Sequence, residues 1–498
     1  MNESYWIAST PATDYPNAPD ALTVDVAVLG GGIAGLNVAA ALKARGRTVA
    51  VVEAARILEG VTGNTTAKVT SSHGLLYAYL VERLGEDRAR LYASAQQTAV
   101  EHIASTAERE RIDCDLVRTE SYIYSEDGTE ELQAEAAAAQ RLGLPVHYTT
   151  ETPLPYDVAG AVRYDNQLRF HPRKYLLALA EGIDGDGSVI LENTRALDVD
   201  AGSPCVVTTD RGIVHANDVV VATHIPFLDR GFYFARQFPM RDYVVAGRLP
   251  KGSDLDGMYL STEQPTHSVR VTEDGDARLV IVGGEGHTTG RADDTAERYE
   301  RLEQWTRERF GVTTFTHRWS TQDYTSSDRV PFIGRFRADN RRLWVATAFG
   351  AWGMTNGTVA GLLLADLVTG QENPWAEVFD PGRLATSQKL LKENAAVAKH
   401  LVSGYLSPGD VQTVADVEPG QAAVVRSGLG KVAAYRDDDG VLHAVSAKCT
   451  HMGCVVAWNG AAKSWDCPCH GSRFDVDGRV LQGPAVRDLG AADVQAER

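Results

Sequence analysis

The chain has 498 residues, of which 44% are hydrophobic, and a formal net charge of −17. This length and composition predict two or three globular domains with ordinary cores. The acidic balance repels phosphate backbones and no run of Lys and Arg offsets it, so nucleic acid is excluded as an expected partner.

The N-terminal segment has neither the basic nor the apolar region of a signal peptide, and no window reaches about 18 uninterrupted apolar residues. We therefore expect neither export nor a membrane anchor. Six cysteines in 498 residues are too few for a secreted disulfide scaffold, which favours a cytoplasmic location.

An apolar strand, a helix and a second strand open the chain. Residues 26–29 predict a buried strand, and the apolar face that begins at Ile33 predicts a helix ending at Gly46. Residues 48–53 predict the second strand. The order strand, helix, strand is a βαβ unit and predicts an α/β, Rossmann-like domain.

A glycine pattern lies in the turn between this first strand and its helix. Gly30, Gly32 and Gly35 fit G-x-G-x-x-G, in which the glycines allow a tight turn, close approach to a pyrophosphate and helix–strand packing. Glu53 ends the second strand, where a carboxylate can accept hydrogen bonds from ribose hydroxyls and repel a 2′-phosphate. The pattern predicts a dinucleotide site and disfavours NADP.

Two distant segments extend this domain. Residues 190–223 predict a β-meander that ends in the apolar strand DVVVAT. Residues 343–347 predict a strand, followed by a small-residue turn and a helix ending near Gly370. The second helix would present its N-terminus, residues 353–356, to a ligand.

These features resemble the FAD-dependent oxidoreductases of the D-amino-acid oxidase and glycine oxidase group, including its γ-glutamylputrescine oxidase branch. The resemblance rests on the glycine pattern with Glu53, GVTGNTTAKVT (60–70), VVVATH, DRVPFIGRF (328–336) and GAWGMTNG. It implies an FAD-binding Rossmann-like domain interleaved with an α+β substrate domain, together spanning 1–375, with the substrate part mainly in 225–325.

The resemblance also implies which residues bind FAD. The loop beside the isoalloxazine ring and the helix N-terminus at its pyrimidine edge supply most of them, since backbone amides there stabilise the negative charge of the reduced ring. Besides the three glycines and Glu53, they are Thr62, Asn64, Thr65, Thr66, Ala67, Lys68, Thr223, Gly353, Met354, Thr355 and Asn356.

The FAD is expected to be non-covalent. Dimethylglycine dehydrogenases in this group carry a flavin-linking His in the equivalent loop, where this sequence has Asn64. His73 lies nearby and keeps a covalent link as the alternative.

The C-terminal part of the sequence differs in its pattern of apolar residues and turns. Residues 376–408 predict a helix-containing connector, and from residue 409 to 498 short apolar strands alternate with turns, as in a small all-β domain. Cys449 and His451 are separated by one residue, and Cys467 and His470 by two. This spacing predicts two metal-ligand loops but does not by itself decide between zinc and an iron–sulfur cluster.

The motifs CTHMGC, CPCHGS and QGPA resemble a Rieske 2Fe-2S domain over its whole length. In such domains two Cys bind one iron and two His the other. The resemblance implies that Cys449 and Cys467 bind one iron and His451 and His470 the second. It also implies a disulfide between Cys454 and Cys469.

The two halves together imply an oxidoreductase. A Rieske oxygenase also needs a mononuclear iron held by two closely spaced His and a carboxylate, and the 13 histidines offer no such pair outside the cluster motifs. The resemblance implies oxidation of a C–N bond in an amine or amino acid, with electrons passing from FAD through the cluster to an external acceptor. Two alternatives remain: a flavin reductase or hydroxylase fed through the cluster by an external donor, and an electron relay without turnover.

Substrate-site residues are the least constrained by the sequence. The candidates lie in MRDYVVAG, in HRWSTQDYTSSDRVPFIG and beside the second helix N-terminus, and an Arg among them could hold a substrate carboxylate. They are Trp352, Arg318, Tyr243 and Asp323, with Gln322 and Tyr324 beside them.

Overall fold

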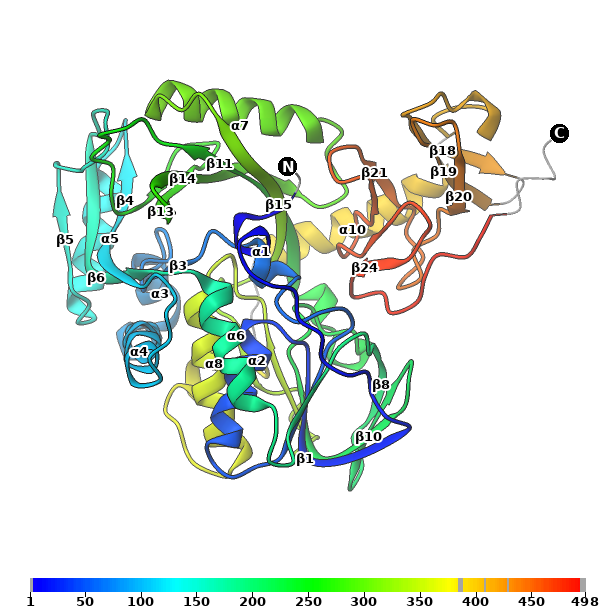
Figure 1. The fold of residues 1–498 in the computed structure, drawn as a ribbon, viewed down its shortest axis with the longest axis horizontal. Helices are drawn as coiled ribbons and strands as arrows, with labels where there is room; N and C mark the ends of the chain where they lie inside the picture. The colour runs from blue at the N-terminus through cyan, green and yellow to red at the C-terminus, as the bar shows by residue number, and fades with distance from the viewer. Residues whose placement is uncertain (1–2, 384–387, 407–408, 428–429, 493–498) are drawn as a thin grey trace.

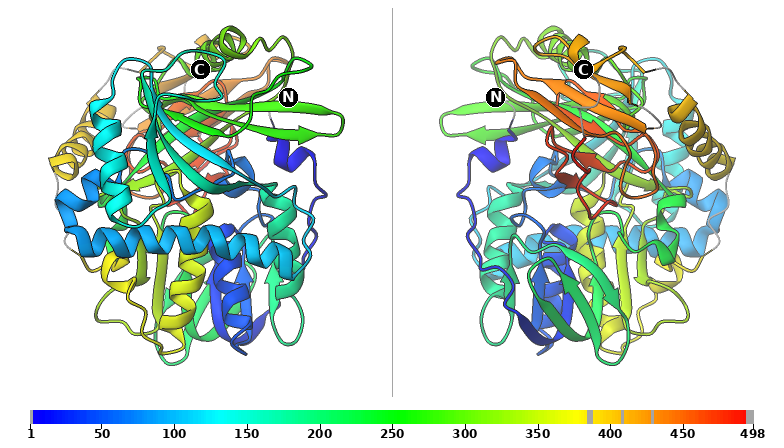
Figure 2. Two further views of the ribbon diagram at one scale, coloured as in Figure 1. Left: turned by 90° about the vertical axis from the view of Figure 1, so that its left-hand side faces the viewer. Right: turned by 90° about the vertical axis from the view of Figure 1, so that its right-hand side faces the viewer.

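The computed structural model describes residues 3–383, 388–406, 409–427 and 430–492. A nucleotide-binding type of domain lies beneath a second large sheet, and a small C-terminal β domain stands at one side of both (Figures 1 and 2). Within the described residues no helix is both long and apolar enough to cross a membrane.

The lower domain is built on a mainly parallel sheet. Its strand order is β16-β17-β10-β1-β2-β7; β16 is antiparallel to β17, and β8 and β9 continue the sheet as a meander from β10. The strands are β1 (Ala21–Leu29), β2 (Val49–Val52), β7 (Val189–Leu191), β8 (Ala196–Asp200), β9 (Cys205–Thr209), β10 (Ile213–Val221), β16 (Phe332–Arg335) and β17 (Leu343–Thr347). The βαβ unit and the β-meander are therefore confirmed.

Three helices pack together beside this sheet in Figure 1: α2 (Ile33–Lys43), α6 (Pro172–Ile183) and α8 (Gly353–Val368). α2 and α8 approach closely because α8 has glycines where they touch. A Cβ on Gly361 would lie 2.8 Å from Asn37 Cβ, and one on Gly357 would lie 2.9 Å from Ile33 Cγ2. The contact at Ile33 and Gly357 places the first turns of the two helices side by side.

The second sheet has the order β15-β11-β14-β13-β12-β4-β6-β3, with β5 paired to β6. Its strands are β3 (Lys68–Val69), β4 (Val117–Ser125), β5 (Val146–Thr149), β6 (Gly160–Arg169), β11 (Gln237–Arg248), β12 (Met258–Ser261), β13 (Ser268–Asp274), β14 (Ala277–Thr288) and β15 (Phe315–Ser326). Helix α7 (Thr295–Phe310) runs along it in Figure 1. Strands from residues 68–169 thus join those from the predicted substrate region, residues 225–325.

The two faces of this sheet enter different cores. Val244 of β11 and Trp319 of β15 belong to the core shared with the lower domain, whereas Tyr243 and Val245 pack with residues of α7. We call these the flavin face and the α7 face. Helices α3 (Tyr77–Leu84), α4 (Glu86–Arg109) and α5 (Glu130–Arg141) complete this half.

The C-terminal part follows α9 (Ala376–Phe379) and α10 (Gln388–Leu406), and α10 accounts for the predicted helical connector. Two antiparallel sheets form the small domain. They contain β18 (Ala422–Ser427), β19 (Gly430–Arg436) and β20 (Leu442–Ser446), and β21 (Ala457–Asn459), β22 (Ser464–Asp466), β23 (Arg473–Phe474) and β24 (Val480–Gln482). The predicted fold class, α/β plus α+β plus a small all-β domain, is confirmed.

Candidate active site and metal centre

The turn after β1 has the geometry of a phosphate cradle. A Cβ on Gly35 would lie 1.8 Å from the carbonyl oxygen of Gly30, and Gly30 itself has φ +107°. Gly32 forms the N-cap of α2 and has no side chain of its own, and the amide of Ile33 at the start of the helix donates to Thr62 Oγ1. The other backbone amides at a helix N-terminus suit a pyrophosphate, so this turn fits the dinucleotide that the sequence predicts.

Glu53 is fixed directly beside this turn. Its Oε2 accepts a hydrogen bond from the amide of Gly31 at 2.7 Å, and its Oε1 accepts one from the amide of Ala55 at 2.9 Å. Burial raises the pKa of Glu53, and the two amides oppose that rise. The carboxyl group therefore lies at the end of β2, where a ribose would meet it.

The predicted flavin loop contains the 3-10 helix η1 (Val61–Asn64) and β3. Thr62 Oγ1 accepts from the amide of Ile33 at 3.0 Å, and the Asn64 amide group donates to the carbonyl oxygen of Gly60 at 2.8 Å. Thr65 Oγ1 accepts from the amide of Ala67, which has φ +58°. These three side chains therefore bond to backbone groups of the protein and stabilise the loop.

Lys68 is pinned at the end of the loop. Its Nζ donates to the carbonyl oxygen of Tyr259. Burial, with the neighbouring Arg270 guanidinium, holds the pKa of Lys68 well below its usual value. Lys68 therefore connects the loop to β12 of the upper sheet.

The N-terminus of α8 begins at Gly353, as predicted, and lies beside that of α2. Thr355 Oγ1 and Asn356 Oδ1 are engaged with His73 Nε2 at 3.0 Å and Gln96 Nε2 at 2.7 Å. These side chains orient the helix, and its free amides are left for a ligand. Thr223 lies on the other side of the cradle, with its amide 3.2 Å from a Cβ built on Gly30.

His73 is held as a neutral imidazole. Its Nδ1 lies 2.8 Å from the Tyr92 hydroxyl, its Nε2 lies 3.0 Å from the carbonyl oxygen of Thr70, and its ring stacks on Trp352. Burial lowers the pKa of His73 to about 3. Both nitrogens are thus engaged with the protein, which supports a structural role for His73.

We accordingly expect FAD to be released by acid precipitation. Neither Asn64 nor the fully engaged His73 offers a free nucleophile to the flavin. The measurement is the flavin absorbance of the supernatant and of the washed pellet after trichloroacetic acid treatment. Colour that stays in the pellet, and that disappears in His73→Ala, would establish a covalent link instead.

Register assigns the substrate candidates to opposite faces of the upper sheet. Tyr243 pairs with Ser320 and lies on the α7 face, where its hydroxyl is 3.0 Å from His287 Nε2. Arg318, also on that face, lies with its guanidinium carbon 5.5 Å from the centre of the Tyr299 ring. We therefore do not include Tyr243 and Arg318 in the substrate site.

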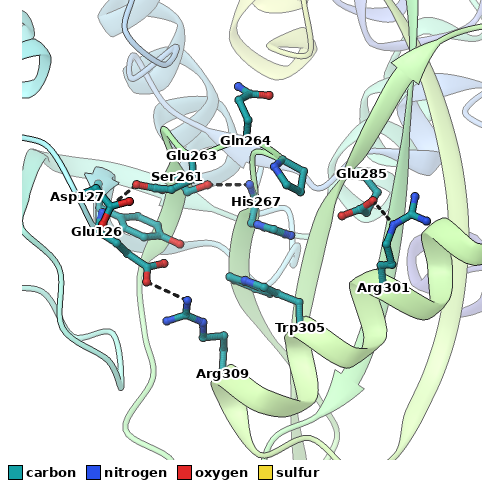
Figure 3. A pocket seen from close by; sticks show the side chains of 12 residues that line it. Glu126, Asp127, Ser261, Glu263, Gln264, His267, Glu285, Arg301, Trp305 and Arg309 are labelled. Carbon is teal, nitrogen blue, oxygen red and sulfur yellow. Dashed lines mark hydrogen bonds and ion pairs between the residues drawn. The ribbon is translucent and has the colours of Figure 1, made fainter.

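The α7 face also carries a cavity of about 350 Å³ between α7 and the turn from β12 to β13 (Figure 3). Glu263, His267 and Trp305 are among its lining residues. Because the sheet separates this cavity from the flavin loop, it is not the substrate site beside FAD.

Asp323 faces the other way and contacts the turn before α8, which the sequence predicts at the flavin edge. Its Oδ2 accepts from the amide of Ala351, in the turn before α8, and its Oδ1 lies 2.9 Å from His224 Nε2. Trp352 ends the same turn. The structure thus brings Asp323 and Trp352 together at the predicted pyrimidine edge.

The side chains of Gln322 and Tyr324 contact the C-terminal domain. The Tyr324 hydroxyl donates to the carbonyl oxygen of His470 at 2.9 Å, and Gln322 Nε2 donates to that of Gly471 at 2.8 Å. Neighbouring residues on β15 therefore serve two sites, because alternate side chains point to opposite faces of a strand.

The four predicted cluster ligands gather between two loops of the small domain. The rings of His451 and His470 lie 5.1 Å apart, and the thiols of Cys449 and Cys467 are buried and unbridged. Hydrogen bonding between the two thiols lowers the pKa of Cys449 and raises that of Cys467. Paired thiols and imidazoles supply the donor set of a Rieske cluster.

The imidazole nitrogens also fit this assignment. His470 Nδ1 is buried without a hydrogen-bond partner among the described residues. His451 Nε2 lies 2.9 Å from Asp229 Oδ1, which leaves its Nδ1 for a metal. An orphaned buried nitrogen beside paired thiols is expected of a metal site.

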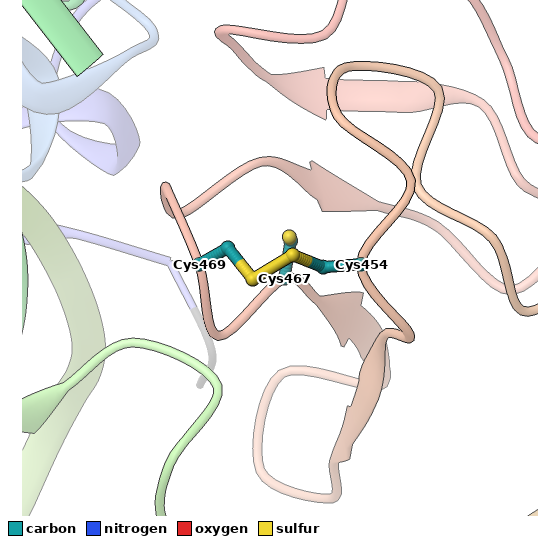
Figure 4. Close-up of side chains that lie close together, drawn as sticks. All are labelled: Cys454, Cys467 and Cys469. Carbon is teal, nitrogen blue, oxygen red and sulfur yellow. A yellow bond between two sulfur atoms is a disulfide. The ribbon is translucent and has the colours of Figure 1, made fainter. Parts of the chain in front are cut away.

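The predicted disulfide between Cys454 and Cys469 is confirmed. It joins the two ligand loops, and Cys467 lies directly beside it (Figure 4). Since Cys454 and Cys469 are bonded to each other, Cys449 and Cys467 are the free sulfur donors of the cluster loops.

Three residues that sequence reasoning missed connect the domains. Phe234 packs against the rings of both His451 and His470, with centroid distances of 5.4 and 5.0 Å. Asp229 contacts His451, and His224 lies 2.8 Å from Gln482 Nε2. The sequence could have indicated His224, because it directly follows the predicted strand VVVAT. No local pattern indicates Phe234 or Asp229, because their partners lie more than 200 residues away in the sequence.

Comparisons with known proteins agree with both halves. Residues 25–367 match the model of the family described as FAD dependent oxidoreductase, and residues 407–493 match that of the Rieske [2Fe-2S] domain. YhfW of Bacillus subtilis (strain 168), a Rieske 2Fe-2S iron-sulfur protein by its name, is 38% identical over 99% of this chain and 98% of its own.

Two further comparisons cover the C-terminal and the N-terminal part of the chain. The cytochrome b6-f complex iron-sulfur subunit of Synechococcus sp. (strain WH7803) is 35% identical over 29% of this chain and 76% of its own. The crystal structure of glycine oxidase from Geobacillus kaustophilus matches with a TM-score of 0.63 and 20% identity, over 73% of this chain and 99% of that one. At this identity the match shows a shared fold.

Proposed function

Since the chain belongs to the FAD-dependent oxidoreductase family and carries a Rieske [2Fe-2S] domain, we propose that it oxidises a C–N bond of a small amine or amino acid. The electrons would pass from FAD to the cluster, with Cys449, His451, Cys467 and His470 as its ligands, and then to an external acceptor. FAD accepts electrons in pairs as hydride, and a 2Fe-2S centre carries them singly.

The observation that carries this proposal is the docking of the cluster loops behind the strand that borders the flavin site. Asp323 contacts the flavin-edge turn from one side of β15, and the next residue, Tyr324, contacts His470 from the other. A single strand therefore separates the two proposed redox centres. The arrangement supports electron transfer within one molecule.

Asp242 supports an amine as the substrate. It pairs with Thr321 on the flavin face, and its carboxylate has no hydrogen bond or ion pair to any described residue. Thr321 Oγ1 is buried and likewise lacks a partner among the described residues. In the segments 238–246 and 319–325 the charged residues on this face are Asp242 and Asp323, so the face attracts a cation.

We expect Asp242→Asn to weaken amine binding at least about tenfold, the loss of about 1.4 kcal/mol. Burial, with the nearby Asp323 carboxylate, raises the pKa of Asp242 to about 6. Amine affinity should therefore fall as the pH drops through about 6 in the wild type and stay flat there in the variant. Titration of the flavin absorbance with amine at pH 5 to 8 measures both effects.

The same substitution should stabilise the fold at high pH. Because the folded-state pKa lies above 3.8, the ordinary value of an aspartate, stability falls as the pH rises between these values, and the full cost applies well above pH 6. It amounts to about 3 kcal/mol. Asp242→Asn should thus melt higher than wild type at pH 8 and equally at pH 4, with Asp276→Asn, on an exposed turn of the same sheet, as control. If both variants changed the melting temperature equally, Asp242 would not be the buried carboxylate of the substrate site.

The whole proposal is tested by anaerobic mixing with a panel of amines and amino acids. The expected result is bleaching of the flavin absorbance, followed by the electron paramagnetic resonance signal of a reduced Rieske cluster. If no amine bleaches the flavin while an external reductase reduces the cluster first, the direction of electron flow is the reverse and the amine proposal fails.

A further inference from the structure

The cavity on the α7 face contains polar atoms that the protein leaves unsatisfied. His267 is 6% exposed, and its Nε2 has no hydrogen-bond partner among the described residues. Glu263 Oε2 is buried and has none either, so these two atoms do not bond to each other. Buried polar atoms of native proteins are nearly always paired, which makes two orphans in one cavity a sign of a missing ligand.

Both orphaned side chains are held firmly in place. Glu263 Oε1 accepts from the Ser125 hydroxyl at 2.9 Å and from the amide of Glu126 at 2.8 Å, which leaves only Oε2 for a ligand. The His267 ring stacks on Trp305, with centroids 4.0 Å apart and planes inclined by 4°. Figure 3 shows this ring between the Glu126 and Glu285 sides of the cavity.

Glu263 Oε2 is an acceptor, and His267 Nε2 is able to be one. Burial lowers the pKa of His267 to about 4, so the imidazole is neutral at pH 7, and its Nε2 accepts in the tautomer with hydrogen on Nδ1 and donates in the other. The two guanidinium groups in the cavity are already paired: Arg309 with Glu126 and Arg301 with Glu285, both at 2.8 Å. Glu263 Oε2 therefore lacks a donor from the lining guanidinium groups.

The charge of the residues that line the cavity also favours a cation as the ligand. Four carboxylates (Glu126, Asp127, Glu263 and Glu285) face two guanidinium groups, so the lining has a net negative charge. A divalent metal is a poorer occupant: among the described residues, the one group of three or more His, Cys, Asp or Glu ligand atoms close enough to share an ion is in the Rieske loops. A volume of about 350 Å³ is within the range of small-molecule sites.

We propose that this cavity is a second binding site, for a small organic cation whose N–H groups donate to Glu263 Oε2 and His267 Nε2. The cation is an ammonium or guanidinium compound, and its apolar part lies against Trp305. The site is separate from the flavin, on the opposite face of the sheet that carries Asp242. It does not depend on the function proposed above.

The test is isothermal titration of the FAD- and cluster-loaded protein with butylguanidinium, and with neutral butyramide as the matched probe. The expected result is one bound butylguanidinium, no change in flavin absorbance and no binding of butyramide. Glu263→Gln should weaken this binding at least tenfold. Glu130→Gln, an exposed carboxylate four residues after the lining residue Glu126, is the control and should leave it unchanged.

A second variant covers the case in which Glu263→Gln does not fold. His267→Phe keeps a ring on Trp305 but removes the Nε2 acceptor, so it should weaken butylguanidinium binding several-fold at an unchanged melting temperature. Asp242→Asn should have no effect, because it lies on the flavin face. The proposal is overturned if butylguanidinium does not bind, if butyramide binds equally well, or if Asp242→Asn and not the cavity variants abolishes binding.

Discussion

Gly35→Ala is expected to yield a protein that retains almost no FAD. The added Cβ would lie 1.8 Å from the carbonyl oxygen of Gly30 and 3.4 Å from Val28 Cγ1. Helix α2 cannot move away from the strand, because α8 packs closely against its other side. A Cβ atom on Gly357 or Gly361 of α8 would already collide with α2. The turn that carries the pyrophosphate amides must therefore distort, at a cost of about 4 kcal/mol or more. The ratio of flavin to protein absorbance, together with the melting temperature, measures the effect.

Gly182→Ala is the matched control for this experiment. It lies within α6, beside α2, where an added Cβ meets no atom within 4 Å. The control should keep its FAD and gain about 0.5 to 1 kcal/mol of stability from the higher helix propensity of alanine. If Gly35→Ala bound FAD as well as this control, the turn after β1 would not be the phosphate cradle.

The parts of the site that sequence reasoning reached are those in which chemistry follows from local spacing. Gly30, Gly35 and Glu53 lie within one βαβ unit, and the Cys and His of each cluster loop lie within three residues of one another. Such geometry is fixed by the turn itself, whatever the rest of the fold does. In the structure Gly30 and Gly35 form the turn between β1 and α2, Glu53 follows β2, and the four Cys and His of the cluster loops lie close together.

The parts of the site that could not be predicted from the sequence depend on strand register. Arg318 and Asp323 are five residues apart on β15, so they point to opposite faces, and only the pairing with β11 shows which face meets the flavin loop. A bulge between Arg241 and Tyr243 adds a further shift. Asp242 was overlooked for the same reason. A single sequence does not specify which face of a strand a distant loop will cover.

Contacts between the domains are the least visible from sequence, and Tyr324 shows why they matter. Its hydroxyl donates to the carbonyl oxygen of the cluster ligand His470 at 2.9 Å and accepts from Gln322 Nε2 at 3.1 Å. Its backbone carbonyl accepts from the amide of Gly350 at 3.0 Å, in the turn that leads into α8. One residue thus connects a cluster loop to the flavin-edge turn.

Tyr324→Phe should therefore slow electron transfer between flavin and cluster about tenfold without loss of either cofactor. The change leaves the buried carbonyl of His470 unpaired, which costs about 1 to 3 kcal/mol, and about 1.4 kcal/mol corresponds to a factor of ten in the equilibrium constant for docking. Photoreduction of the flavin, followed by the rise of the reduced-cluster signal, measures the rate without any substrate. Faster hydrogen exchange in residues 467–472 would report the same loosening directly.

Tyr405→Phe is the control, because it removes the same kind of bond from the other ligand loop. The Tyr405 hydroxyl donates to the carbonyl oxygen of Gly453 at 2.6 Å, but Tyr405 is 40% exposed, so water can replace the bond. This variant should transfer electrons at the wild-type rate. Equal rates in the wild type and both variants would mean that docking through Tyr324 does not limit transfer. If both variants transferred electrons equally slowly, the cause would be a change at the cluster itself. The Tyr324 and Tyr405 hydroxyls have in common only that each bonds to a loop that carries cluster ligands.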